Sequence, residues 1–163
     1  MSILKVDTIN EKTSGNGVAI PGHVVQVVYG ALSSIYSYSS SVTADHDILT
    51  VNITPKFNTS KILLTGNFGH YLNSSNLTDR GDYVFKRGST NIFATGTDGF
   101  GYFRFSGFLK SMNNTHNYLD SPATTSSVAY TLHHTIYTNS AGGAFGPTVT
   151  NLTLMEIAQW VLS

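Results

Sequence analysis

The chain has 163 residues, with nine Lys or Arg and nine Asp or Glu, so its formal net charge is zero. This length suffices for one domain with a hydrophobic core. The charge balance argues against an electrostatic nucleic-acid binder and against a membrane-surface protein, because both need an excess of Lys and Arg. No apolar run approaches the roughly 20 residues of a membrane span, so no membrane insertion is expected.

Uncharged polar residues dominate the composition. Only 11% of the residues are charged, against roughly 25% in an ordinary soluble domain, whereas 52 of the 163 residues are Ser, Thr or Asn. Nine Tyr and nine Phe supply aromatic mass, and there is no Cys. Disulfides and thiolate chemistry are therefore excluded, and the composition favours a neutral aromatic β protein over an enzyme.

Residues 1–22 are predicted to form an N-terminal arm, with a β head over residues 23–163. Turn-forming residues at 13–17 and the Pro21-Gly22 break set the arm apart. Its apolar side chains are too few to form a core of their own, so they must lie on something else. They are Ile3, Leu4, Val6, Ile9, Val18 and Ile20. The sequence leaves two alternatives open: a strand on the same domain, or a segment for attachment or trimer lacing.

From His23 onward, short β-branched and aromatic runs alternate with polar turns, which is typical of strands. The expected strands cover Val24–Tyr29, Leu49–Ile53, Ile62–Tyr71, Tyr83–Lys86, Ile92–Thr95, Phe103–Leu109, Val128–Ile136 and Asn151–Ala158. Arg87–Asn91 is expected to be a hairpin loop. Eight or nine strands of this kind predict an all-β antiparallel sandwich or jelly roll. An amphipathic helix over Leu154–Leu162 is the alternative at the C-terminal end.

No residue pattern predicts catalysis, a metal site or a cofactor. His133 and His134 are neighbours, and neighbours on a strand point to opposite faces, so they cannot share one metal. His46, between Asp45 and Asp47, is expected on a solvated loop tip. Asp79 and Asp82 are expected to serve turns at a strand entrance.

One carboxylate lies where an apolar strand is expected. Glu156 sits within Leu152–Ala158, and a buried carboxylate needs a partner. We expect an ion pair with Arg80, Arg87 or Arg104, or a polar network near a symmetry axis.

Several blocks, taken in order, resemble segments of bacteriophage tail-fibre and virion structural proteins, notably those of marine and freshwater phages. The blocks are Ile3–Ile9 with Thr13–Val18, Pro21–Val28, Ile53–Lys56 with Thr59–Leu63, Lys86–Thr90, Tyr118–Tyr130 and Leu152–Ala158. Together they cover most of the chain, and Tyr118–Tyr130 is the most specific of them.

The resemblance implies a non-enzymatic protein of the phage particle surface, made in the host bacterial cytoplasm and assembled as a homotrimer. The strand order looks similar to the jelly rolls of trimeric complement globular heads. A tail-fibre or tail-tip protein would dock to other virion proteins through residues 1–22 and present its head to a host-surface glycan or protein. The alternative is a capsid decoration or head-fibre protein that stabilises the shell. A polysaccharide-degrading spike is disfavoured, because it needs paired carboxylates in a cleft.

Recognition is expected from loops at one end of the sandwich, because the strand faces are committed to the core. The stretch Asn91–Asn117 matches no block of the resemblance, and it contains loop tips expected near Asp98 and near Asn113-Asn114. The candidate recognition residues are Asp98, Tyr102, Asn113, Asn114 and His116. An alternative is that Phe103 and Phe105 form a core strand and the rest is solvated loop. The aromatic excess at low charge favours a trimer, and it suits weak polyvalent contacts with sugars.

Overall fold

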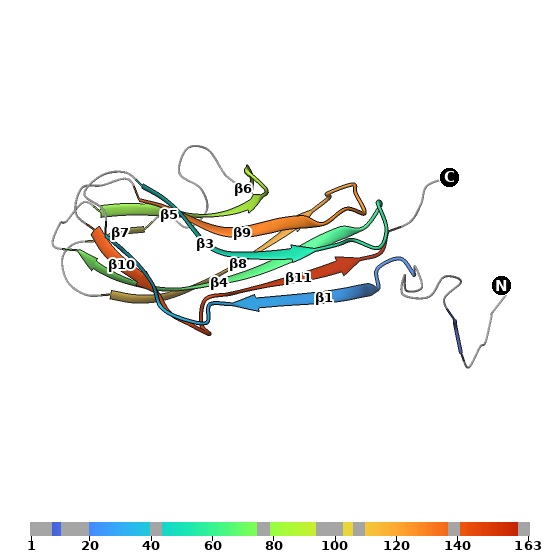
Figure 1. The fold of residues 1–163 in the computed structure, drawn as a ribbon, viewed down its shortest axis with the longest axis horizontal. Coiled ribbons are helices and arrows are strands. Elements are labelled where there is room, and N and C mark those ends of the chain that lie inside the picture. The colour runs from blue at the N-terminus through green and yellow to red at the C-terminus, as the bar shows by residue number, and fades with distance from the viewer. Residues whose placement is uncertain are drawn as a thin grey trace.

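The computed structural model describes residues 8–10, 20–39, 44–74, 79–93, 103–105, 110–136 and 141–159, which form two antiparallel sheets packed face to face (Figure 1). No helix that could cross a membrane occurs among these residues. The all-β sandwich predicted from the sequence is therefore confirmed.

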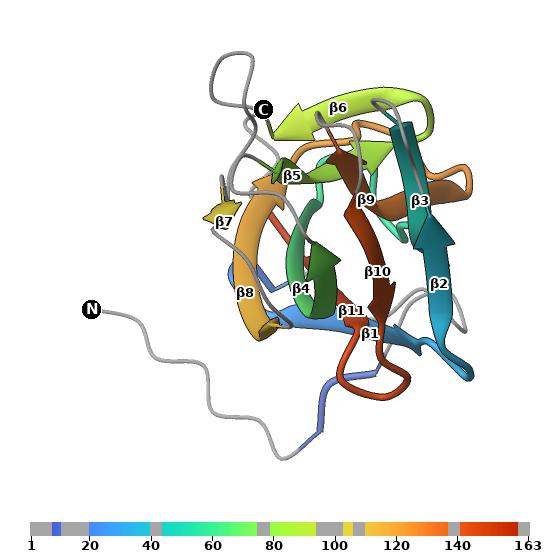
Figure 2. The ribbon, with the colours of Figure 1, turned by 90° about the vertical axis from the view of Figure 1, so that its left-hand side faces the viewer.

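The first sheet contains β1 (Val24–Ala31), β2 (Tyr36–Ser39), β4 (Lys61–Ser74), β8 (Lys110–Asp120), β10 (Ala141–Phe145) and β11 (Asn151–Ile157). Strand β8 follows one edge of the long strand β4, whereas β11 and β10 lie end to end along its other edge. Strand β1 then pairs with β11, and β2 pairs with β10. Figure 2 shows β8, β4 and β10 as neighbouring strands with β2 beyond them.

The second sheet contains β3 (Ala44–Ile53), β5 (Asp79–Arg87), β6 (Thr90–Phe93), β7 (Phe103–Phe105) and β9 (Val128–Ile136). Its order is β3, β9, β5, with β6 and β7 both pairing to the far edge of β5. Along the chain, the path crosses repeatedly between the sheets, and the late strands β9 and β11 lie between early ones. This arrangement is that of a jelly roll, the more specific of the two predicted architectures.

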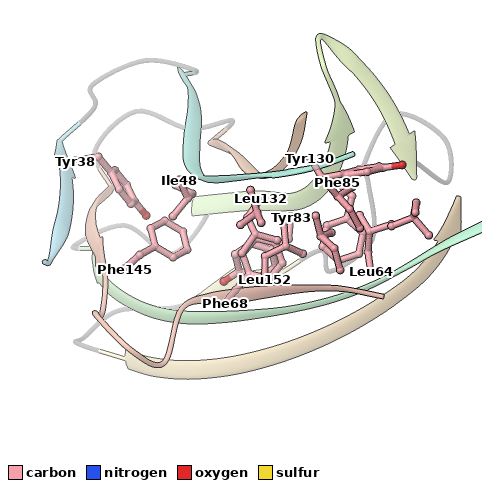
Figure 3. Packing of buried hydrophobic residues seen from close by; sticks show 14 residues of the cluster. Tyr38, Ile48, Leu64, Phe68, Tyr83, Phe85, Tyr130, Leu132, Phe145 and Leu152 are labelled. Carbon is pink, nitrogen blue, oxygen red and sulfur yellow. The ribbon is translucent and has the colours of Figure 1, made fainter. Parts of the chain in front are cut away.

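The core forms because apolar side chains alternate along the strands and one face of each sheet turns inward. On β11, Leu152 and Leu154 are fully buried while their neighbours are half-buried. Phe68 of β4 meets Tyr83 of β5 with ring centroids 4.4 Å apart, and this pair lies between the sheets (Figure 3). Aromatic pairs of this kind join the two sheets in the middle of the sandwich.

Three described strands have no counterpart in the sequence prediction, namely β2, β8 and β10. Strand β11 continues to Ile157, so the helix alternative for Leu154–Leu162 is wrong over its described part. The Arg87–Asn91 hairpin is confirmed but tighter, because β5 ends at Arg87 and β6 begins at Thr90. Gly88 has a φ of +58° in that turn, a conformation that glycine adopts without steric cost.

Two predictions about acidic residues are wrong. Asp45, His46 and Asp47 lie in strand β3 and not at a loop tip. Asp79 begins β5, at the strand entrance where it was expected, whereas Asp82 lies within β5 and is fully buried. Polar residues of this kind favour turns, whereas cross-strand pairing with β9 and β7 holds them in the sheet.

Glu156 joins the two sheets where β1 begins and β11 ends. Its carboxylate is buried and accepts hydrogen bonds from the backbone N–H of Lys56 (2.8 Å) and the backbone N–H of Phe57 (3.2 Å), just after β3. The side-chain amide of Gln26 on β1 donates a third, at 2.6 Å. Backbone and amide donors thus serve this carboxylate among the described residues, and Arg87, one of the three expected partners, binds Asp120 instead. The side chains of Arg80 and Arg104 lie outside the described part.

A second carboxylate joins the sheets at the same end. Arg87 of β5 donates to both oxygens of Asp120, at 3.1 and 2.9 Å, and the Tyr130 hydroxyl of β9 donates to one of them at 2.7 Å. Asp120 ends β8 of the first sheet, whereas Arg87 and Tyr130 belong to the second. We refer to the Glu156 and Asp120 networks as the two carboxylate clasps.

We expect Glu156→Ala to lower the free energy of unfolding by about 3 kcal/mol, because it leaves the part-buried N–H groups of Lys56 and Phe57 and the Gln26 amide without this acceptor. Glu156→Gln keeps one acceptor oxygen and is expected to cost roughly 1 kcal/mol. Urea denaturation of the three proteins at neutral pH measures the difference. Equal stability of Glu156→Ala and the unaltered chain would contradict the structural role of this clasp.

Candidate recognition surface

Three histidines lie in the interior at the end of the sandwich opposite the clasps. The ring of His70 on β4 lies 2.6 Å from the Tyr38 hydroxyl through Nε2 and 2.7 Å from the Tyr83 hydroxyl through Nδ1. His134 of β9 contacts the same Tyr38 hydroxyl at 3.4 Å and the Asp82 carbonyl at 3.1 Å. His46 of β3 stacks on Tyr38. These contacts connect both sheets through neutral hydrogen bonds.

Burial keeps these imidazoles uncharged. It lowers the pKa of His70 to about 3 and the pKa of His134 well below its ordinary value. Burial also lowers the pKa of His46. A neutral imidazole has one donor and one acceptor nitrogen, which is what two flanking tyrosine hydroxyls require of His70. His70 and His134 are therefore parts of the core, and the half-buried His46 packs beside them.

His133 points to the opposite face, as predicted from its position beside His134. Its Nδ1 lies 2.7 Å from an Asp47 oxygen, and its Nε2 lies 3.3 Å from an Asp45 oxygen, on the outer face of the second sheet. A hydrogen bond from Thr135 lowers the pKa of Asp45. Burial by itself would raise the pKa of Asp47, but hydrogen bonds from His133 and Lys86 have the larger effect and lower that pKa. Within the described ranges, no three His, Asp or Glu residues form a metal-binding group.

The outer face of the first sheet carries a row of apolar side chains that runs across β1, β11, β4 and β8. The strand register places Val27, Met155, Leu63 and Leu119 side by side on β1, β11, β4 and β8. Val27 is 56% exposed and Leu119 is 45% exposed. Among described strands, every exposed large apolar side chain belongs to this sheet and none to the second. We call these four residues the apolar row.

Beyond the apolar row, the same face becomes polar. One row contains Tyr29, Thr153, Thr65 and Asn117, and the next contains Ala31, Asn151, Asn67 and Thr115. In the second of these, the Asn67 amide donates to the Asn151 side chain at 2.9 Å, and the Thr115 hydroxyl donates to Asn67. Neutral side chains thus bond to one another along the surface.

A shallow hollow of about 240 Å³ follows still farther along this face. It lies where β4, β8 and the turn between β10 and β11 meet, and it is lined by Gly69, His70, Tyr71, Ser111, Asn113, Gly146 and Val149. Val149 packs over Gly69 so closely that a Cβ there would lie 2.3 Å from its Cγ2. Tyr71 is 41% exposed, and Ser111 lies directly opposite it on β8. None of its described lining residues carries a carboxylate, an ammonium or a guanidinium group.

The predicted recognition residues are distributed differently from expectation. Asp98 and Tyr102 lie outside the described residues. Asn113, Asn114 and His116 lie in strand β8, so the loop tip predicted at Asn113-Asn114 is wrong. Asn113 is exposed and lines the hollow.

Asn114 and His116 face inward from β8. Asn114 hydrogen-bonds Tyr83, and the His116 ring lies against Phe68 at a centroid distance of 6.0 Å. Sequence reasoning missed Tyr71 as a surface residue. The alternation that places Phe68 and His70 inward on β4 contains the signal, because Tyr71 then points outward.

The arm residues Ile3, Leu4, Val6 and Val18 also lie outside the described residues. Ile9 is 56% exposed, and Ile20 is half-buried. The base of the arm is tied to the head by hydrogen bonds from Gly22 N to the Ala158 carbonyl and from Ala158 N to the His23 carbonyl. The arm therefore leaves the head beside the clasps and the apolar row.

No protein-family model matches the chain, and no curated protein matches it. Among solved structures, it is similar to the VP2 subviral particle of infectious bursal disease virus, with 11% identity and a TM-score of 0.44 over 83% of this chain and 37% of that one. The Gx strain structure of that virus gives 12% identity and a TM-score of 0.40 over 85% and 37%. This chain thus spans well under half the length of either. At such TM-scores the likeness identifies neither a family nor a function.

Acid is expected to destabilise the fold through the interior histidines. The unfolded His70 binds a proton near its ordinary pKa of 6.5, whereas the folded one does so only near 3. Between these values the unfolded state binds more protons, so stability falls as pH falls, by about 1.4 kcal/mol per pH unit from this residue.

Urea denaturation at steps from pH 5.5 to pH 4 measures this slope. In His70→Gln, the amide still offers a donor and an acceptor to the two tyrosines. The dependence of the unfolding free energy on pH should then be smaller by about 1.4 kcal/mol per pH unit. Identical slopes in both proteins would contradict the buried neutral state of His70.

Proposed function

We propose that this chain is a non-enzymatic structural protein of a bacteriophage virion, namely a tail-fibre or tail-tip component. In this proposal, residues 1–22 dock to another virion protein, and the jelly-roll head forms a homotrimer that faces the host surface. The protein is made in the bacterial cytoplasm and ends on the particle surface. The observation that carries the proposal is the one-sided distribution of exposed apolar side chains beside the base of the arm.

The resembling blocks support a shared module, because they contain both carboxylates of the clasps and all of their partners except Phe57. Glu156 lies in the block Leu152–Ala158, and its donors Gln26 and Lys56 lie in two further blocks. Asp120 and Tyr130 lie in the most specific block. The resemblance therefore involves interactions that hold the sheets together, and it supports a common head fold more than a common receptor.

The apolar row supports self-association. Exposed apolar side chains that lie contiguously on one face are typical of surfaces that become buried in an assembly. Val27 and Leu119 lie at opposite edges of the first sheet, so a neighbouring copy could cover the row across its full width. Closed symmetric association of identical chains is the common outcome for such a surface.

The two ends of this face differ, with the apolar row at one end of β4 and the hollow at the other. Leu63 of the apolar row and Tyr71 of the hollow are eight residues apart on β4, which corresponds to roughly 27 Å at about 3.4 Å per residue. The arm base lies at the Leu63 end. A head attached through its arm would therefore hold the apolar row near the particle and the hollow away from it, which suits a tail-fibre component.

Deletion of the gene from a phage that carries it, with complementation by residues 23–163 alone, tests the docking of the arm. We expect the truncated head to fold and be soluble but to be absent from purified particles, whereas the full chain restores incorporation. Gold-labelled antibody then locates the protein. Label on the tail supports the proposal, label over the shell supports the decoration alternative, and absence of the full chain from particles would contradict both.

Light scattering at micromolar concentration tests the trimer. The unaltered chain is expected to have three times its 17.6 kDa mass. The double variant Val27→Thr with Leu119→Thr removes exposed apolar groups from the row and should shift the protein toward monomer. Ile35→Thr is the matched control, because Ile35 is 64% exposed but lies outside the row. A stable monomer of the unaltered chain would contradict the homotrimer.

A further inference from the structure

We propose that the hollow beside Tyr71 binds one neutral sugar ring, a hexopyranose or N-acetylhexosamine at the end of a surface glycan. The inference deepens the proposed function and rests on it, since it gives the outward part of the head a ligand. The evidence for it is the shape of the hollow and the chemistry of its lining residues, and it needs no assumption about the arm or the trimer.

The shape suits a small, flat ligand. At about 240 Å³ the hollow is smaller than the roughly 300–1,000 Å³ of sites for drug-sized molecules. Gly69 and Gly146 leave its base without side chains, and Val149 closes one side. Because Val149 occupies the space above Gly69, the free volume is displaced toward Tyr71 and Asn113.

The lining chemistry matches a polyhydroxylated ring. Tyr71 is 41% exposed and offers an aromatic face on which the C–H face of a pyranose can stack. Asn113 and Ser111 are both exposed on the neighbouring strand, opposite Gly69 and Tyr71 respectively. An amide and a hydroxyl each donate and accept hydrogen bonds, which is what sugar hydroxyls need.

The same lining disfavours other ligand classes. The described lining residues include no Lys or Arg, so they offer no partner for a phosphate, sulfate or carboxylate group. They include no Asp or Glu either, so they offer no counter-charge for a cation. The ring of His70 is committed to Tyr38 and Tyr83 inside the core, so it adds no ionised group to the surface. A neutral polar ring remains the class that fits.

A single shallow site of this kind is expected to bind weakly, with a dissociation constant on the order of 1 mM. Three copies on one homotrimer, and many trimers on one particle, convert such binding into useful avidity. The weak single site would also let a particle release and rebind along a cell surface.

Saturation-transfer NMR of the full chain with methyl hexopyranosides, N-acetylglucosamine and N-acetylgalactosamine tests the proposal, with glucuronic acid as the charged comparison. At least one neutral sugar should bind. Tyr71→Ala should weaken that binding at least tenfold, Tyr71→Phe should retain it, and Asn113→Ala should weaken it severalfold. Tyr29→Ala is the matched control, since Tyr29 is 62% exposed on the same sheet but does not line the hollow.

Circular dichroism confirms that each variant is folded before binding is compared. The site is refuted if no neutral sugar binds, if glucuronic acid binds better, or if Tyr71→Ala binds as the unaltered chain does. Incorporation into particles is measured separately. A protein that enters particles without binding sugar removes the sugar site alone, whereas one that binds sugar but never enters particles removes the proposed function alone.

Discussion

Two buried carboxylates hold the sandwich together at the end from which the arm departs. Glu156 accepts hydrogen bonds from backbone N–H groups of the segment after β3. Asp120 accepts hydrogen bonds from the Arg87 guanidinium and the Tyr130 hydroxyl. Each network joins one sheet to the other, so the spacing of the sheets at this end is set by hydrogen-bond lengths. Ionised acceptors form shorter and stronger bonds than neutral ones. The start of β1, where the arm joins the head, is therefore held directly to this network through Gln26.

The opposite end of the core is held by a different chemistry. There the sheets meet through histidine, tyrosine and phenylalanine rings, with His70 stacked on Phe145 at a centroid distance of 4.4 Å. Hydrogen bonds between neutral groups connect the rings. The clasp end depends on carboxylate acceptors, whereas this end depends on uncharged imidazoles. The hollow lies on the outer face of the first sheet, at this histidine-containing end of the sandwich.

Sequence reasoning succeeded where inner and outer residues differ in polarity. Leu49–Ile53 and Val128–Ile136 alternate plainly, and both lie in observed strands. It failed on β8, because the inward residues Asn114 and His116 are themselves polar and hide the alternation. It failed on β10, because Ala141–Phe145 contains two glycines that resemble a loop.

The candidate site was only partly accessible to the same reasoning. The sequence predicts Asn113 at a loop tip, whereas the structure places it in a strand, from which it lines the hollow. Tyr71 and Val149 become neighbours only through the pairing of β4 with β10 and β11 and the turn that joins those two strands. Such contacts depend on register across strands far apart in the chain, and a single sequence does not specify them.

The position of β11 has a consequence for biosynthesis. This strand is the last described one in the chain, yet it lies between β1 and β4 and supplies hydrogen bonds to both. While residues 151–157 are still inside the ribosome, the emerging β1 has no partner and β4 has one open edge. Folding thus waits for translation to pass this point, and pairings so distant in sequence form slowly. Nascent chains would expose their strand edges to one another on the polysome, where neighbouring copies are already close.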